Sequence, residues 1–312
     1  MIALNRYGSP RINPVWLCLM CMTVIFLSSL SSAAAADKLQ VYTVNYPLAY
    51  FAERIGGAHV DVQFPAPAGI DPAFWMPDTE TIAAYQQADL ILLNGADYAK
   101  WVEKVSLSRR KLVDTSSPFR DDYITNSDDV THQHGPGGEH AHAGTAFTTW
   151  LDFSQAARQA EQVVMTMKKL RPAHAGVFAK NYQRLQRDLL QLDARLHEIM
   201  AKSPDLPLLA SHPVYQYLAR RYGLNLHAVM WEPDTYPDAS SWQAFKFLHE
   251  AHPAHWMLWE DEPVDKTRDR LLNSGVNIVV FKPCMNRPAQ GDFMTVMQAN
   301  IKALAEPFNA PY

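Results

Sequence analysis

The chain has 312 residues and a formal net charge of −4 at pH 7 with its histidines neutral. This mildly acidic balance argues against nucleic-acid binding, which requires a basic surface. Only Cys284 lies outside the first 36 residues, so the rest of the chain cannot form an intramolecular disulfide. Its length is sufficient to bury a core without one.

The N-terminus has the pattern of an export signal. Arg6 and Arg11 supply positive charge, Val15 to Leu30 is mostly apolar, and residues 31–36 are small. We therefore expect residues 1–36 to be a cleavable signal peptide and the mature protein to be periplasmic. The alternative is an uncleaved membrane anchor, but the apolar run is short for a span of about 20 residues.

Strand and helix patterns alternate in the segment that follows. Period-two alternation and continuous apolar runs predict strands, and capped or amphipathic segments predict helices. The predicted strands are Leu39–Val44, Val60–Phe64 and Leu90–Leu93, and the predicted helices are Pro47–Ile55 and Thr79–Gln87. Such alternation is typical of helices layered around a parallel sheet.

The middle of the chain changes character. Residues 116–147 are polar and predict a loop, whereas Phe153–Lys202 predicts helix with a break at Pro172. From Ala175 to Met200 the apolar residues follow a 3.6-residue stripe, which predicts one helix of about 40 Å.

A second alternating half follows this helix. It contains predicted strands Leu206–Ala210, Leu226–Trp231, Trp256–Trp259 and Val276–Phe281, and predicted helices Val214–Tyr222, Ala239–Ala251, Val264–Asn273 and Phe293–Ala305. We therefore predict an α/β fold with two lobes, each a mainly parallel sheet flanked by helices. The expected boundaries are 37–172 for the N-terminal lobe, 173–202 for the linking helix and 203–312 for the C-terminal lobe.

Four histidines lie close together in the polar segment: His132, His134, His140 and His142. Neutral imidazole is a good ligand for zinc and other borderline divalent metals. The Gly and Pro residues between the two pairs predict a loop over residues 131–143, which we call the His-rich tract. We interpret the tract as a metal contact; the alternative is a surface insert whose histidines only solvate it, since short His-rich tracts are compositional evidence.

Several short motifs occur in a fixed order along the chain. They are Gly69-Ile70-Asp71-Pro72, Ala88–Gly95 followed by Trp101, the His-rich tract, Trp150-Leu151-Asp152, Ser211-His212-Pro213, Tyr217–Leu224, and Gly291-Asp292-Phe293 with Met297 and Asn300. In this order they resemble the periplasmic solute-binding proteins of zinc and manganese ABC importers, from about Leu39 to Ala305. The resemblance implies two lobes joined by a single long helix, with one metal ion in the cleft between them.

The resemblance also locates four metal-ligand positions, and the chain departs from the family at three of them. Ala73 and Thr148 stand where the family has histidines, and Lys282 stands where it has a carboxylate; only His212 is retained. Zinc sites take about four N, S or O ligands. A protonated lysine about 4 Å from a cation would cost roughly 4 kcal/mol per unit charge at an effective dielectric near 20. Either Lys282 points away or the inherited site is lost.

Carboxylates follow two predicted strands of the second half, as Glu232 and Glu260. The carboxyl ends of parallel strands are where α/β folds bind ligands, and carboxylate oxygens suit hard to borderline metals. We predict metal ligation by His212 with Glu232, Glu260 and the histidines of the tract. The alternatives are that His212 only packs, and that one of the two glutamates pairs with Lys282.

Taken with the resemblance, these features predict a monomeric solute-binding protein. It would carry zinc, or manganese or another divalent metal, to an ABC permease in the inner membrane. The sequence has no nucleophile elbow, P-loop, His-Glu-x-x-His or Gly-x-Gly-x-x-Gly pattern, so we expect no enzyme. The second hypothesis is a module that has lost ion transport and binds an organic ligand, a metal chelate or a partner protein, favoured if aromatic residues such as Trp231 and Trp259 line the cleft.

Overall fold

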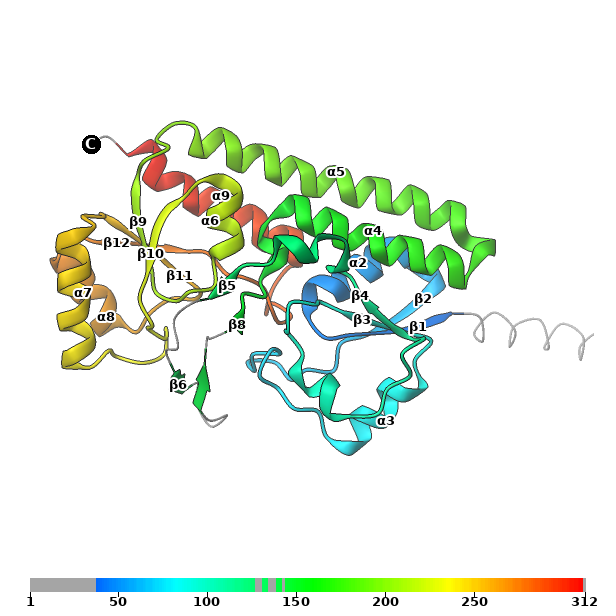
Figure 1. The fold of residues 1–312 in the computed structure, drawn as a ribbon. Helices are drawn as coiled ribbons and strands as arrows, with labels where there is room; N and C mark the ends of the chain where they lie inside the picture. The colour runs from blue at the N-terminus through cyan, green and yellow to red at the C-terminus, as the bar shows by residue number, and fades with distance from the viewer. Residues whose placement is uncertain (1–37, 127–130, 134–138, 142–143, 311–312) are drawn as a thin grey trace, which may run out of the picture. The chain divides into compact units, whose positions relative to one another are not determined.

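Two four-stranded parallel sheets form the framework of the protein (Figure 1). The computed structural model describes residues 38–126, 131–133, 139–141 and 144–310. The first sheet has the order β2-β1-β3-β4, with strands β1 (Leu39–Thr43), β2 (Val60–Gln63), β3 (Leu90–Leu93) and β4 (Leu112–Asp114). Three of these strands confirm the sequence prediction. Strand β4 was not predicted, because three residues are too few to show an alternation.

Two helices of the first lobe begin where a side chain caps the first turn. The Asn45 side chain accepts a hydrogen bond from the backbone of Leu48 at the start of α2 (Tyr46–Gly56). The Asp78 side chain accepts one from Thr81 at the start of α3 (Thr79–Gln87). Such caps satisfy backbone N–H groups that the helix itself leaves without acceptors, and they fix where each helix starts.

The second sheet repeats the parallel arrangement, in the order β10-β9-β11-β12. Its strands are β9 (Pro207–Ala210), β10 (Asn225–Ala228), β11 (Trp256–Trp259) and β12 (Asn277–Val280), and its helices are α6 (Gln216–Tyr222), α7 (Ala239–Ala251), α8 (Asp265–Asn273) and α9 (Phe293–Asn309). Strand β10 ends at Ala228, three residues before the predicted end. The two-sheet α/β prediction is therefore confirmed, with small shifts in the strand ends.

A helical pair connects the two sheets. Helix α4 (Phe153–Leu170) ends just before Pro172, and α5 (Ala175–Met200) follows after a short 3-10 turn. The break arises because proline has no N–H to donate and its ring clashes with the preceding turn. Figure 1 shows α5 running alongside α4 and α9. The predicted long linking helix is thus confirmed, although Val177 in its first turns is 44% exposed and does not belong to the buried stripe.

One hydrophobic core extends through both lobes. Val41 of β1, Leu189 of α5 and Leu208 of β9 all belong to a single cluster of contacting buried side chains. The linking helix is also attached to the C-terminal lobe by a polar contact, because Asp193 accepts hydrogen bonds from Arg221 and from Tyr222 of α6. Helix α5 thus packs into the same core as strands of both sheets.

The segment predicted as a loop contains short strands. Strand β5 (Thr125–Asn126) pairs antiparallel with β8 (Gly144–Thr145), and β6 (Thr131–Gln133) pairs with β7 (Glu139–Ala141). The loop prediction was wrong for these residues, because two- and three-residue strands leave no readable pattern. The predicted signal peptide, residues 1–36, lies outside the described residues. Within the described ranges, no helix is both long and apolar enough to cross a membrane.

Candidate functional site

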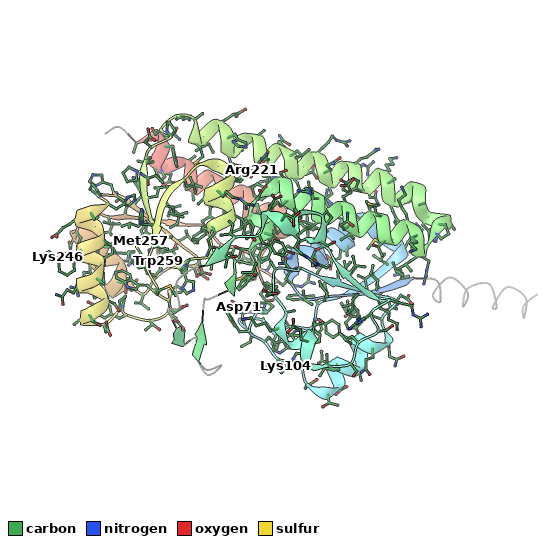
Figure 2. All side chains as sticks on the ribbon, viewed as in Figure 1. Asp71, Lys104, Arg221, Lys246, Met257 and Trp259 are labelled. Atoms are coloured by element: carbon green, nitrogen blue, oxygen red, sulfur yellow. The ribbon has the colours of Figure 1, made fainter. Side chains whose placement is uncertain are left out.

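A cavity of about 150 Å³ receives side chains from both lobes. Its lining consists of Asp71, Phe74, Phe147, His212, Val214, Glu232, Pro233, Glu260 and Met285. Asp71, labelled in Figure 2, comes from the segment between β2 and α3. His212, Glu232 and Glu260 come after the carboxyl ends of β9, β10 and β11. This is the edge at which open parallel sheets bind their ligands.

His212 and Glu232 lie close together in this cavity. The Nδ1 atom of His212 lies 3.3 Å from Oε1 of Glu232, and the two side chains are 2% and 22% exposed. The backbone explains the proximity, because the Trp231 N–H donates a 2.7 Å hydrogen bond to the Ser211 carbonyl. The residues that follow β9 and β10 are thereby held side by side. Two of the predicted ligands are thus brought together.

The pKa of Glu260 reflects the acidic groups gathered in this cavity. Removal from solvent, together with the nearby carboxylates of Glu232 and Asp71, raises the pKa of Glu260 to about 8. Acidic groups that share a small cavity disfavour one another's charged forms, and a cation placed among them relieves the repulsion. The cavity is therefore electrostatically suited to a cation.

The four groups surround the cavity without converging on one point. Among the residues that the structure describes, no three His, Cys, Asp or Glu side chains already stand in an arrangement that would hold a metal ion. Binding would require side-chain rotation of Asp71, Glu232 or Glu260. Each has rotatable bonds and is only partly buried, whereas His212 is fixed by burial.

Asp71 was not predicted as a site residue. Its Oδ1 accepts a 2.8 Å hydrogen bond from the Ala73 N–H, which closes a tight turn. The segment that carries it is held from across the cleft, because the Asn286 side-chain amide donates to the carbonyls of Pro67 and Ile70, both at 2.7 Å. The one signal in the sequence was its place in the motif Gly69-Ile70-Asp71-Pro72, which directly precedes Ala73.

Lys282 points away from the cavity. Its Nζ lies 2.8 Å from Oδ1 of Asp261, and these side chains are 48% and 60% exposed. Partial burial would raise the pKa of Asp261, but the hydrogen bond from Lys282 holds that pKa below its usual range. The alternative that Glu232 or Glu260 pairs with Lys282 was therefore wrong. The positive charge that argued against a cation is neutralised at the surface.

Ala73 and Thr148 do not supply replacement ligands. Both are buried, and neither lines the cavity. The Thr148 hydroxyl donates a 2.5 Å hydrogen bond to the Val214 carbonyl, so its proton is already engaged. The loss of two family histidines is therefore not compensated at the same positions.

The His-rich tract is only partly described. The backbone of His132 lies opposite that of His140 in the β6–β7 ladder. His134 and His142 lie outside the described residues. Metal contact by these four histidines stays a prediction.

The tryptophans considered for the organic-ligand hypothesis belong to a separate core. Trp231 and Trp259 are buried and pack with Trp242 and Phe245 inside the C-terminal lobe. Neither lines the cavity, although Phe74 and Phe147 do. Pockets for organic ligands are usually about 300–1,000 Å³, so the cavity is small for the organic-ligand hypothesis.

Comparison with known proteins relates this geometry to a family. The family model ZnuA, zinc-uptake complex component A, periplasmic, matches residues 41–307. The zinc-binding lipoprotein AdcA of Streptococcus pneumoniae (strain ATCC BAA-255 / R6) is 24% identical over 303 residues, which cover 93% of this chain and 60% of AdcA. The chain thus spans less than two thirds of that relative.

Two further proteins are similar over most of their length. The high-affinity zinc uptake system protein ZnuA of Bacillus subtilis (strain 168) is 26% identical over 246 residues, 78% of this chain and 77% of that protein. The crystal structure of the metal-dependent lipoprotein YcdH from Bacillus subtilis matches with a TM-score of 0.74 at 22% identity, over 86% of this chain and 99% of that one, which shows a shared fold. Because the family model covers most of the chain, the protein belongs to the family of the periplasmic zinc-uptake complex component A.

Proposed function

We propose that this protein is the solute-binding component of a metal ABC importer and that it carries a divalent cation, zinc in the first place, in the cavity between its lobes. The observation that supports this most is the lining of that cavity, which includes His212 together with Asp71, Glu232 and Glu260. One imidazole and three carboxylates offer about the four ligands that a zinc ion takes.

The charges of the cavity support a cation as cargo. Three acidic side chains and one imidazole line a space of about 150 Å³, and Lys282 is neutralised outside it. A dication would replace mutual repulsion by attraction in a partly desolvated site. The relatives AdcA, a zinc-binding lipoprotein, and the Bacillus ZnuA, a high-affinity zinc uptake protein, favour zinc among the divalent ions.

The contacts between the lobes favour a carrier that closes only slightly. The Tyr46 N–H donates to the Met285 carbonyl at 3.0 Å, and the Trp150 indole N–H donates to the Pro283 carbonyl at 2.8 Å. Together with the shared core and α5, these bonds oppose a wide hinge motion. We infer that the chain acts in the periplasm after signal cleavage and presents its closed lobes to a membrane permease.

Zinc titration of the metal-stripped protein tests the proposal. We expect one high-affinity site, weakened at least about 100-fold in His212→Ala because a direct ligand is lost. His197→Ala is the matched control, since that imidazole lies on α5 with a 48% exposed side chain and does not line the cavity. No binding at micromolar zinc would overturn the proposal. Unchanged affinity in His212→Ala would do the same, and deletion of residues 131–143 would then show whether the tract holds the ion.

A further inference from the structure

Two histidines meet on the surface of the C-terminal lobe, remote from the cavity. His227 lies in β10, the edge strand of its sheet, and His252 follows α7. Their ring centroids are 4.3 Å apart and their planes are tilted by 44°. His252 contacts the carbonyl of Leu208 near the start of β9, whereas His212 follows the end of that strand. The pair is thus separate from the groups that line the cavity.

The hydrogen bond of His252 determines which of its ring nitrogens has a lone pair for a metal ion. Its Nε2 lies 3.0 Å from the Leu208 carbonyl oxygen. A carbonyl can only accept, so this nitrogen carries the proton, and the Nδ1 of the neutral ring keeps its lone pair. Histidines that bind metals are commonly oriented in this way, with the second ring nitrogen donating to a backbone carbonyl. His227 is exposed and therefore accessible to an ion.

The separation of the two rings is close to that of a chelating pair. With Zn–N bonds of about 2.0–2.1 Å, two imidazoles on one ion place their centroids roughly 4.5–5.2 Å apart. The observed 4.3 Å lies just below this range, and the exposed His227 side chain can rotate to widen it. The pair His59–His174 gives a contrast, because its rings stack at 3.9 Å and 20°, and the nitrogens of stacked rings do not converge on one ion.

We propose that His227 and His252 form a second, surface site for a borderline divalent ion such as Zn²⁺, Cu²⁺ or Ni²⁺. Imidazole suits these ions better than Mg²⁺, Ca²⁺ or Mn²⁺. Two protein ligands leave the remaining coordination positions to water, so the site binds more weakly than a four-ligand cavity. The chain accordingly takes up a second ion whose binding depends neither on His212 nor on the His-rich tract.

Zinc titration of the full chain labelled with ¹⁵N in its histidines tests this site, with imidazole signals followed by NMR. Beyond one equivalent of zinc, the signals of His227 and His252 should shift together, while those of His59 and His174 should not. His227→Ala should weaken the response of His252 at least about tenfold. Signals of His227 and His252 that stay in place up to millimolar zinc would overturn the proposal. An unchanged His252 response in His227→Ala would overturn it as well.

A second variant distinguishes loss of the metal site from loss of the fold. His252→Gln keeps an amide donor for the Leu208 carbonyl but removes the open ring nitrogen. It should therefore keep the melting temperature of the parent chain and weaken the His227 response at least about tenfold. If the His227 response is unchanged in this variant, the two rings do not chelate one ion. His212→Ala separates the sites, because it should leave the responses of His227 and His252 intact whatever happens in the cavity.

Discussion

The Glu232 carboxylate lies 3.3 Å from the His212 imidazole, at the ends of two neighbouring parallel strands. His212 is the one residue that the chain retains of the four ligand positions implied by the family resemblance. Around it the chain places acidic side chains at positions where the family pattern did not lead us to expect ligands. Under the proposed function, this pair is the core of a metal site in which carboxylates take the place of histidines.

Glu232→Gln tests whether this carboxylate binds the ion. The amide keeps the size of the side chain but removes its charge, so zinc affinity should fall at least about tenfold while the fold is retained. Calorimetric titration measures this, with Glu262→Gln as the control, because Glu262 is exposed and does not line the cavity. Equal affinities of the two variants would remove Glu232 from the site.

Lys282→Ala tests whether the lysine charge reaches the cavity. Its ammonium is paired with Asp261 at the surface, and exposed pairs of this kind contribute about 0–1 kcal/mol to stability. We therefore expect zinc affinity within about threefold of the parent chain. A gain of tenfold or more would show that Lys282 repels the bound ion, contrary to its position in the structure.

Asn286→Ala tests how Asp71 is positioned. The Asn286 amide holds the segment of Asp71 through two carbonyls but does not line the cavity. Its loss should increase hydrogen exchange in residues 64–76 and weaken zinc binding by about tenfold, as for other residues that orient a ligand. Asn225→Ala is the control, since the exposed Asn225 amide donates to the Asp205 carbonyl and does not line the cavity. Faster exchange with unchanged affinity would exclude Asp71 as a ligand.

Asp193→Asn tests the attachment of the linking helix. Burial would raise the pKa of Asp193, but hydrogen bonds from Arg221 and Tyr222 outweigh it and hold that pKa below its usual value of 3.8. The folded state therefore gains stability from the charged Asp193 at neutral pH, and this gain is lost as the pH falls through the lowered pKa. The variant should be about 1–2 kcal/mol less stable at pH 7. The difference should shrink below about pH 3.8 in urea unfolding; a constant difference would contradict the assignment.

The regular elements were largely predictable because their patterns are local. The apolar stripe of α5 and the break at Pro172 follow from residues within one helix. Strand β4 and the short β5–β8 ladder were missed because strands of two or three residues are too short to show a periodic pattern. Elements with a long repeat were therefore found, and pairings of two or three residues were not.

The site was predictable only on one side of the cleft. Glu232 and Glu260 follow strands of the same sheet as His212, so strand order alone brings them together. Asp71 comes from the other lobe, and the packing that places it opposite His212 is tertiary. The pairing of Lys282 with Asp261 follows from the strand register. Strands β11 and β12 are parallel with Trp259 opposite Val280, so Asp261 and Lys282, each two residues further along, lie side by side.

X-ray absorption at the zinc K-edge tests the central claim most directly. The metal-stripped full chain would be loaded with one equivalent of zinc, below the amount that fills a weaker surface site. We predict one or two imidazole nitrogens and at least two oxygen ligands around the ion, and a loss of imidazole signal in His212→Ala. A shell of three or more imidazoles that persists in His212→Ala would contradict the account, because the ion would then be held by other histidines and not by the cavity.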